Sequence, residues 1–379
     1  MHSNEKINIV IAGSGVIGLS VCYQLLLSAA KNLPLKITII AKHFPHDPLS
    51  HEYTSPWAGA HFRPFPHKPE TFGSDKRESL YTRGTLKFFH ELIDKQNRKD
   101  STIEFMKGID YLESPTKEYI NSSAGYNSKT LAKFKPIKGS CLPKNATLGY
   151  EYETWCLNAP KYLLFLVKEI NRLSSELNIP IVWERKALTK LSDIKALYVT
   201  NVDLIFNCTG LGLQWNGGID VNCYKIRGQT LLISVPKDRK IPYDDCTITY
   251  QAKDGKWTFV IKRPNNDDPM DRQFILGGTK QPCDCQTIPR AQDSEELLAR
   301  GKILYPELFD PSSGKANIKN VNVGFRPARI GGSRVDLEYF NKIGVINVYG
   351  FGGMGYEASI GAAQHALCLY NQFLRQNKL

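Results

Sequence analysis

The chain has 379 residues, of which 42% are hydrophobic and 23% charged, and its formal net charge is +12 at pH 7. This composition is typical of a globular protein whose core is large enough for two lobes. The 49 basic residues are scattered and accompany no zinc-ligand spacing or helix-turn-helix pattern, so we expect no nucleic-acid partner. No stretch approaches 18 consecutive apolar residues, and the sequence therefore predicts no membrane span.

Nine cysteines, an odd number, are scattered along the chain, several of them in apolar runs. We therefore expect free thiols in a reducing compartment. Cys283 and Cys285 are too close in sequence for the usual metal-binding spacing, and no metal site is predicted. The N-terminus leads directly into an apolar run, so we expect no signal peptide.

The N-terminal stretch predicts a strand, a turn and a helix. Residues 7–12 are apolar and rich in β-branched side chains, Gly13-x-Gly15-x-x-Gly18 follows, and residues 19–26 have helical spacing. In such a unit the first glycine permits the tight turn, the second admits a pyrophosphate and the third lets the helix pack on the strand. The pattern predicts dinucleotide binding and leaves nicotinamide and flavin cofactors open.

A second strand predicted at residues 35–41 completes this unit, but it ends in Ala41-Lys42. A dinucleotide-binding unit usually carries an acidic residue here for the ribose hydroxyls. The Lys42 cation would suit a 2′-phosphate, or the dinucleotide is held by other means. Residues 47–60 are rich in Pro, Gly and small side chains around Trp57. They predict an ordered loop that lies against a flat ligand, with a tight surface turn as the alternative.

The rest of the chain predicts a strand-rich middle between two α/β ends. Helices are predicted at residues 75–93, 162–177, 294–303 and near 363–370, and strands at residues 181–183, 202–206, 226–233, 258–261, 274–280 and 345–349. Residues 100–150 are expected to be mostly loops with short strands. The last strand runs into Gly350-x-Gly352-Gly353-x-Gly355, a second glycine-rich junction before a helix.

We therefore expect an α/β fold with a Rossmann-like cofactor lobe and a second lobe built on an antiparallel or mixed sheet. The expected domains are discontinuous. Residues 1–60, 155–218 and 320–379 are assigned to the cofactor lobe, and residues 61–154 and 219–319 to the substrate lobe.

Seven segments together resemble, in the same order, the D-amino-acid oxidase family of flavoproteins, which includes the D-aspartate oxidases. They are residues 13–19, 53–60, 207–211, 227–229, 276–278, 324–327 and 349–356. The Ser-Pro-Trp-Ala-Gly loop at residues 55–59 is similar to that of the fungal members. The resemblance covers nearly the whole chain and implies FAD as the cofactor and oxidation of D-amino acids by O₂ to 2-oxo acid, ammonia and hydrogen peroxide.

The resemblance also implies which residues hold the cofactor. They are Gly13, Ser14, Gly15, Val16, Ile17, Gly18, Ala41, Lys42, Thr54, Ser55, Trp57, Ala58, Gly59, Thr209, Gly210, Arg326, Gly350, Gly352, Gly353, Met354, Gly355 and Tyr356. For the substrate, it implies that Arg326 of Gly-Phe-Arg-Pro binds the carboxylate as a planar fork, although a lone arginine is more often a surface ion pair. The backbone carbonyl of Gly353 would hold the amine.

Two positions depart from the family pattern. Where the family usually has a tyrosine that helps to hold the carboxylate, this chain has Phe259, and Tyr250 is the candidate substitute. In Gly-Gly-Thr-Lys-Gln, Lys280 stands where D-aspartate oxidases have an arginine for the side-chain carboxylate. Lys280 with His61 and Arg63 would favour acidic D-amino acids, the alternative being ordinary solvated cations.

Three other possibilities stay open. The nearest is a D-aspartate oxidase or another amine or imino-acid oxidase, the second is a flavin-binding protein without oxidase activity, and the most distant is a nicotinamide-dependent dehydrogenase. The C-terminal Asn377-Lys378-Leu379 matches two of the three residues of the peroxisomal address Ser-Lys-Leu. Because the reaction releases peroxide, we expect a peroxisomal location and the import receptor as a partner, with the cytoplasm as the alternative.

Overall fold

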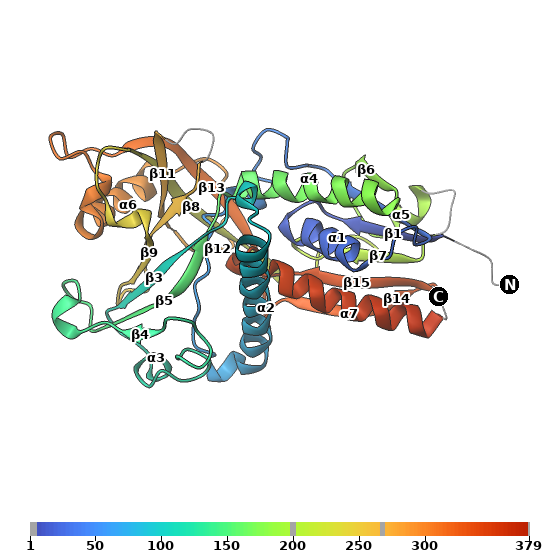
Figure 1. The fold of residues 1–379 in the computed structure, drawn as a ribbon, viewed down its shortest axis with the longest axis horizontal. Coiled ribbons are helices and arrows are strands. Elements are labelled where there is room, and N and C mark those ends of the chain that lie inside the picture. Colours follow the sequence, from blue (N-terminus) through green and yellow to red (C-terminus); the bar gives the residue numbers. More distant parts are fainter. Residues whose placement is uncertain (1–5, 198–201, 266–269, 378–379) are drawn as a thin grey trace.

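The computed structural model describes residues 6–197, 202–265 and 270–377, and shows two β-sheets at opposite ends of an elongated molecule (Figure 1). Lys378 and Leu379 of the expected peroxisomal address lie outside the described residues. Helix α2 (Phe72–His90) stands between the two sheets and packs against the C-terminal helix α7 (Ser359–Asn377).

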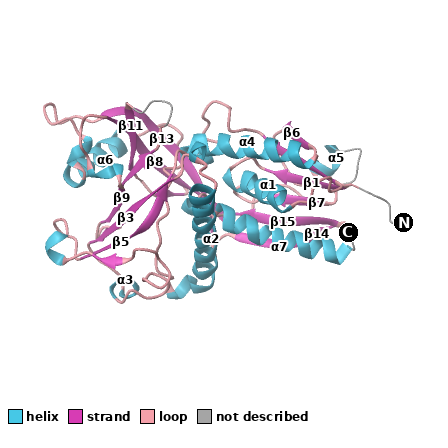
Figure 2. Ribbon diagram, viewed as in Figure 1, coloured by secondary structure: helices cyan, strands magenta, loops and turns pink. Residues whose placement is uncertain are grey.

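The first sheet has six strands in the order β14-β15-β7-β1-β2-β6 (Figure 2). Their bounds are Ile7–Ala12 (β1), Leu35–Ala41 (β2), Ile181–Arg185 (β6), Leu204–Asn207 (β7), Arg334–Phe340 (β14) and Ile343–Tyr349 (β15). All pairs are parallel except β14 with β15. The face of this sheet that bears Ile9 and Ile11 packs against helices α1 (Val16–Ser28), α4 (Ala159–Leu177) and α7. The opposite face, which bears Val10, packs against α5 (Asp193–Leu197).

The second sheet has nine strands in the order β12-β8-β11-β10-β9-β3-β5-β4, with β13 also paired to β8. Their bounds are Glu104–Leu112 (β3), Lys135–Pro136 (β4), Leu148–Cys156 (β5), Cys223–Pro236 (β8), Cys246–Gln251 (β9), Trp257–Arg263 (β10), Asp271–Gly277 (β11), Gln281–Pro282 (β12) and Asn317–Arg329 (β13). Only β3 and β9 pair in parallel, so the sheet is mixed, as predicted. Helix α6 (Ala291–Leu304) packs on one face through Leu297.

The prediction that residues 100–150 are mostly loops with short strands is confirmed for residues 113–147, but it missed the nine-residue strand β3. Strands β3 and β5 have nine residues each and pair with each other along their full length. A short helix, α3 (Lys117–Ile120), lies between them. Strand β3 mixes charged and apolar side chains without a clean alternation, whereas β5 alternates at Tyr150-Glu151-Tyr152-Glu153. The partners that stabilise both strands lie elsewhere along the chain.

Strand β13 joins the two sheets. It pairs with β8 of the second sheet from Asn317 to Arg329, and near its end Ala328 forms a bridge with Phe351 in the last glycine-rich segment. The discontinuous domain boundaries expected from the sequence stay a prediction.

Helix α1 approaches strand β1 so closely that side chains have no room in the turn. Gly13 has φ +111°, and a Cβ there would lie 2.4 Å from the carbonyl oxygen of Cys208. A Cβ on Gly18 would lie 2.0 Å from the carbonyl oxygen of Gly13. The two glycines therefore set the distance between strand and helix.

No helix within the described ranges is long and apolar enough to cross a bilayer. All nine cysteines are free, as expected, and Cys141, Cys283, Cys285 and Cys368 are exposed. Nowhere in the described part of the chain do three or more His, Cys, Asp or Glu side chains form a group that could hold a metal ion.

Substitution of Gly18 by Ala should destabilise the fold by about 1–3 kcal/mol, because the new methyl group overlaps backbone that cannot move alone. The melting temperature of Gly18→Ala measures this loss. Gly73→Ala is the matched control, since a Cβ at this helical position meets nothing within 4 Å. An equal melting temperature for Gly18→Ala and the wild type would contradict the packing argument.

Candidate active site

Three glycine-bearing turns meet at one edge of the six-stranded sheet. Strands β15, β7 and β1 are adjacent and parallel, so their carboxyl ends lie at the same edge. The Cys208 N–H donates to the Ala12 carbonyl at 2.9 Å, and the Gly350 N–H donates to the Gly210 carbonyl at 3.0 Å. This edge of an open α/β sheet is where dinucleotides bind.

The N-terminus of α1 opens toward the same edge. The Val16 N–H donates to Ser55 Oγ at 3.0 Å, whereas the N–H groups of Gly15 and Ile17 find no acceptor among the described residues. Ser14 is held in place because its hydroxyl donates to the His43 carbonyl and its own carbonyl accepts from the Tyr53 hydroxyl. Free N–H groups at the positive end of a helix dipole suit a pyrophosphate.

Glu52 supplies a carboxylate at the end of β2, where the sequence shows only Ala41-Lys42. Its Oε2 accepts from Lys42 Nζ and lies 3.2 Å from His43 Nε2, and these two hydrogen bonds lower the pKa of Glu52. The Lys42 cation is therefore paired and does not favour a 2′-phosphate. Sequence reasoning missed Glu52 because it lies ten residues past Lys42, in the loop that returns to the strand end.

The Ser-Pro-Trp-Ala-Gly loop lies between the two sheets. The Thr54 hydroxyl donates to the Phe325 carbonyl of β13 at 2.7 Å. Trp57 stacks on His51 with ring centroids 5.4 Å apart, and its indole N–H donates to the Ser50 carbonyl at 2.9 Å. Ala58 is partly exposed. A Cβ on Gly59 would lie 2.7 Å from Ile261 Cδ1 of β10, so the loop is an ordered connection to the second sheet.

The last glycine-rich segment closes on this loop and on α1. The Tyr356 hydroxyl donates to the Ser55 carbonyl at 2.9 Å, and a Cβ on Gly355 would lie 3.7 Å from Val16 Cγ1. Gly350 and Gly352 have φ values of +83° and +57°, which favour glycine. Helix α7 begins at Ser359, past Gly353, Met354, Gly355 and Tyr356, so it starts somewhat before the predicted residues 363–370 and runs beyond them.

The residues that line this edge fit FAD. Free N–H groups at the N-terminus of α1 would bind the pyrophosphate of FAD. The glycines of this edge, which have no side chains, would let the backbone approach the flat flavin ring. The Thr209 hydroxyl supports the cradle, because it donates to Asn207 Oδ1 at 2.8 Å and accepts from the Leu213 N–H at 2.7 Å. Gly210, with φ +75°, turns the chain beside it.

Arg326 extends from β13 toward the last glycine-rich segment. A Cβ on Gly353 would lie 3.7 Å from Arg326 Cδ. A Cβ on Gly228 would lie only 2.5 Å from Arg326 Nη1, so Gly228 makes room for the guanidinium. Nη1 donates to the Thr279 carbonyl at 3.1 Å. No carboxylate within the described ranges pairs with Arg326, and burial lowers its pKa. A partly buried cation without a counter-charge favours an anionic ligand.

Two further cations lie near Arg326. Burial lowers the pKa of Lys280, and the positive charges of Lys68 and Arg326 lower it further. Both lysines are exposed, and no carboxylate of the described residues forms an ion pair with Lys280 or Lys68. Lys68 was not identified from the sequence because it comes from a loop 212 residues away, and no motif surrounds it.

Phe259 faces the same side of the second sheet as the Gly277-Gly278 backbone. A Cβ at either glycine would lie 2.3 Å from an atom of the Phe259 ring, so the ring covers these two residues. The ring lies 6.3 Å from that of His61, centroid to centroid, beside the Ser55–Gly59 loop.

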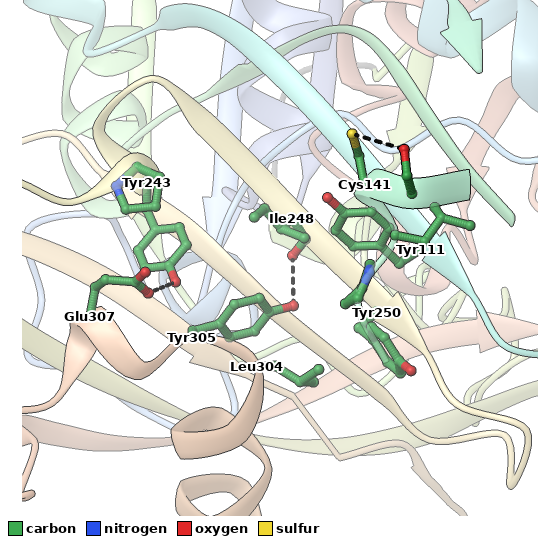
Figure 3. A pocket seen from close by; sticks show the side chains of 12 residues that line it. Tyr111, Cys141, Tyr243, Ile248, Tyr250, Leu304, Tyr305 and Glu307 are labelled. Carbon is green, nitrogen blue, oxygen red and sulfur yellow. Dashed lines mark hydrogen bonds between the residues drawn. The ribbon is translucent and has the colours of Figure 1, made fainter. Parts of the chain in front are cut away.

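Tyr250 does not substitute for the absent hydroxyl at position 259. It pairs with Thr258, so alternation along the strands places its side chain on the opposite face from Phe259. There Tyr250 donates to Glu113 Oε1 at 2.8 Å and lines a cavity of about 310 Å³ together with Tyr111, Tyr243 and Tyr305 (Figure 3). The prediction that Tyr250 could replace the family tyrosine is therefore wrong.

His61 and Arg63 do not add usable positive charge, contrary to the expectation. Burial lowers the pKa of His61 to about 3, with a further effect from Arg63, so the imidazole is neutral at physiological pH. Arg63 is buried and its Nε donates to Asp110 Oδ1 at 3.2 Å. Its guanidinium also contacts the Tyr119 hydroxyl and the Trp257 ring, so its charge is already compensated.

Comparisons with known proteins agree with this geometry. The family model described as DAO, FAD dependent oxidoreductase, matches residues 8–369. A D-aspartate oxidase from Talaromyces thermophilus is 31% identical over 94% of this chain and 93% of its own length. A D-amino-acid oxidase from Schizosaccharomyces pombe is 31% identical over 97% of both chains.

Solved structures share the fold at low sequence identity. A glycine oxidase from Bacillus cereus superposes with a TM-score of 0.67 at 15% identity, over 97% of this chain and 98% of its own. An L-alpha-glycerophosphate oxidase from Mycoplasma pneumoniae, solved with FAD bound, gives 0.66 at 16% identity over 97% and 95%. The sequence match and the glycine-lined cradle together show that this chain belongs to the DAO family of FAD-dependent oxidoreductases.

Proposed function

We propose that this flavoprotein oxidises D-amino acids with O₂ to 2-oxo acids, ammonia and hydrogen peroxide, and that it prefers acidic D-amino acids. The observation that carries the proposal is Arg326, a partly buried guanidinium beside Gly353 for which the described part of the chain supplies no carboxylate partner. The relatives named D-aspartate oxidase and D-amino-acid oxidase support the same reaction class.

The protein's own contribution is to position the substrate. Arg326 would bind the α-carboxylate as a bidentate fork, and the Gly353 carbonyl would accept from the amine. Phe259 and the Gly277-Gly278 backbone beneath it form an apolar wall near this position. Bound FAD supplies the two-electron acceptor that O₂ reoxidises. Because the reaction removes a hydride from the α-carbon, orientation matters more than acid–base catalysis.

The preference for acidic substrates rests on Lys280 and Lys68. These lysines add positive charge near Arg326, whereas the charges of Lys42 and Arg63 are already paired. A substrate with two carboxylates would place one on Arg326 and the other toward the lysines. Lysine cannot make the bidentate contact of an arginine, so we expect a preference rather than strict selectivity.

A flavin-binding role without oxidase activity is the second candidate. It is favoured by one observation, the lack of a tyrosine hydroxyl at Phe259 with Tyr250 on the opposite face of the sheet. We further propose that the protein acts in the peroxisome through the import receptor, since Asn377-Lys378-Leu379 resembles the address and peroxide is the product. The cytoplasm is the alternative location.

Anaerobic mixing with D-amino acids tests the reaction. We expect D-aspartate to bleach the yellow flavin spectrum of the wild type, and Arg326→Met to bind FAD but to bleach about 100-fold more slowly or not at all, because the charge-assisted contact is lost. A wild-type protein that no D-amino acid bleaches would support the flavin-binding candidate instead. Normal bleaching of Arg326→Met would remove Arg326 from the substrate site.

Lys280→Met tests the preference. We expect kcat/KM for D-aspartate to fall about 10-fold, as for the loss of one hydrogen bond to a charged group, and kcat/KM for D-alanine to change by less than about 2-fold. Steady-state kinetics with both substrates measure the ratio. Lys315→Met is the control, because Lys315 lies in the exposed turn before β13. The proposal fails if the ratio of the two kcat/KM values stays unchanged in Lys280→Met.

A further inference from the structure

A cavity of about 310 Å³ lies on the face of the nine-stranded sheet that is opposite to the face bearing Phe259 (Figure 3). Strands β3 and β9 form its floor through Tyr111, Ile248 and Tyr250. Its walls are the end of α6 and three short turns at residues 139–141, 242–244 and 306–308. The sheet therefore separates this cavity from Phe259 and from the proposed substrate site.

The cavity is lined by four tyrosine rings, those of Tyr111, Tyr243, Tyr250 and Tyr305. The rings of Tyr243 and Tyr305 meet edge to face, with centroids 5.6 Å apart. The Tyr305 hydroxyl donates to the Thr258 carbonyl at 2.7 Å, and the Tyr250 hydroxyl donates to Glu113 Oε1 at 2.8 Å. Because these bonds fix the rings within the protein, the aromatic surface is preorganised for a ligand.

Two carboxylates stand at the edge of this aromatic surface. Glu307 lines the cavity, is exposed, and accepts from the Tyr243 hydroxyl through Oε2, as the dashed line in Figure 3 shows. Glu113 is the acceptor for Tyr250. Neither carboxylate forms an ion pair with a cation in the part of the chain that the structure describes.

The lining supplies no positive charge. No Lys, Arg or His occurs among the described residues that line the cavity, although the whole chain has a net charge of +12. Arg239 donates to the Glu307 main-chain carbonyl at 3.4 Å, but its charge is paired with Asp310. Burial raises the pKa of Tyr243 and of Tyr250, and their hydrogen bonds to carboxylates raise it further, so both hydroxyls stay neutral. The carboxylates therefore make the cavity locally negative, which disfavours anions.

We propose that this cavity binds a small organic ammonium cation, whose alkyl groups contact the tyrosine rings and whose charge faces Glu307. The face of a tyrosine ring attracts a cation, and a carboxylate without a counter-ion adds to that attraction. The Tyr111 hydroxyl has no hydrogen-bond partner among the described residues and is available to a polar group of the ligand. The inference does not depend on the proposed oxidation of D-amino acids, and its failure would leave that reaction untouched.

Calorimetric titration of the holoenzyme with choline tests the proposal. The matched control ligand is the alcohol in which carbon replaces the choline nitrogen, because it has the same shape without the charge. We expect choline to bind saturably, with one molecule per chain, and the uncharged alcohol to bind about 10-fold more weakly or not at all. Equal affinity for the two ligands, or no binding of choline, would overturn the proposal.

Two variants connect binding to this cavity. Glu307→Gln keeps an acceptor for the Tyr243 hydroxyl but removes the charge, so its Kd for choline should rise about 3-fold, as for the loss of one exposed ion pair. Glu295→Gln, an exposed position on α6 outside the lining, should bind choline as the wild type does. Ser140→Trp places a large ring at the exposed rim and should abolish binding without lowering the melting temperature. Wild-type affinity in both Glu307→Gln and Ser140→Trp would contradict the assignment.

Cys141 provides a local readout, because its thiol is exposed and lines the cavity. Choline at about ten times its Kd should slow alkylation of Cys141 by iodoacetamide about 10-fold, following the unoccupied fraction. Cys368, an exposed thiol on α7, is the internal control and should react at an unchanged rate, as measured by mass spectrometry of the peptides. Choline that binds but leaves Cys141 unprotected would place its site elsewhere and refute the inference.

Discussion

The architecture depends on the close approach of backbone to backbone where β1, β7 and β15 end. A methyl group on Gly18 would lie 2.0 Å from the Gly13 carbonyl oxygen, and one on Gly13 would lie 2.4 Å from that of Cys208. This spacing aligns the N-terminus of α1 with the turns after β7 and β15. It allows main-chain N–H groups, rather than charged side chains, to bind the phosphates.

Arg63 and Arg326 differ in whether their positive charge is available to a ligand, and the difference comes from their surroundings. Arg63 is fully engaged by Asp110, Tyr119 and Trp257, so it holds the second sheet together and offers nothing to a ligand. Among the residues that the structure describes, Arg326 has a single backbone partner and no carboxylate, so its charge remains available. The difference lies in the partners and not in residue type, so only the motif around Arg326 distinguished the two arginines in the sequence.

Much of the cofactor lobe could be predicted from local sequence, because its signals are short. The glycine spacing after β1, the apolar strands and the helical periodicity of α4 and α7 each lie within about 20 residues of chain. The pairing of β3 with β5 on one side and with β9 on the other could not be predicted, since these contacts join segments far apart in sequence. For the same reason Lys68 and Glu52 were missed, and the face of Tyr250 could not be assigned until its register with Thr258 was known.

Strand β13 is shared by both halves of the site, since it pairs with β8 throughout and touches Phe351 near its end. Arg326 lies on the part of this strand that spans the junction. Any rotation of one sheet relative to the other must therefore shift the guanidinium with respect to the Gly353 carbonyl. This limits how the substrate pocket of the strand-rich half can evolve. Substitutions that bend β13 would also move Arg326, the residue proposed to bind the substrate carboxylate, out of alignment with the flavin.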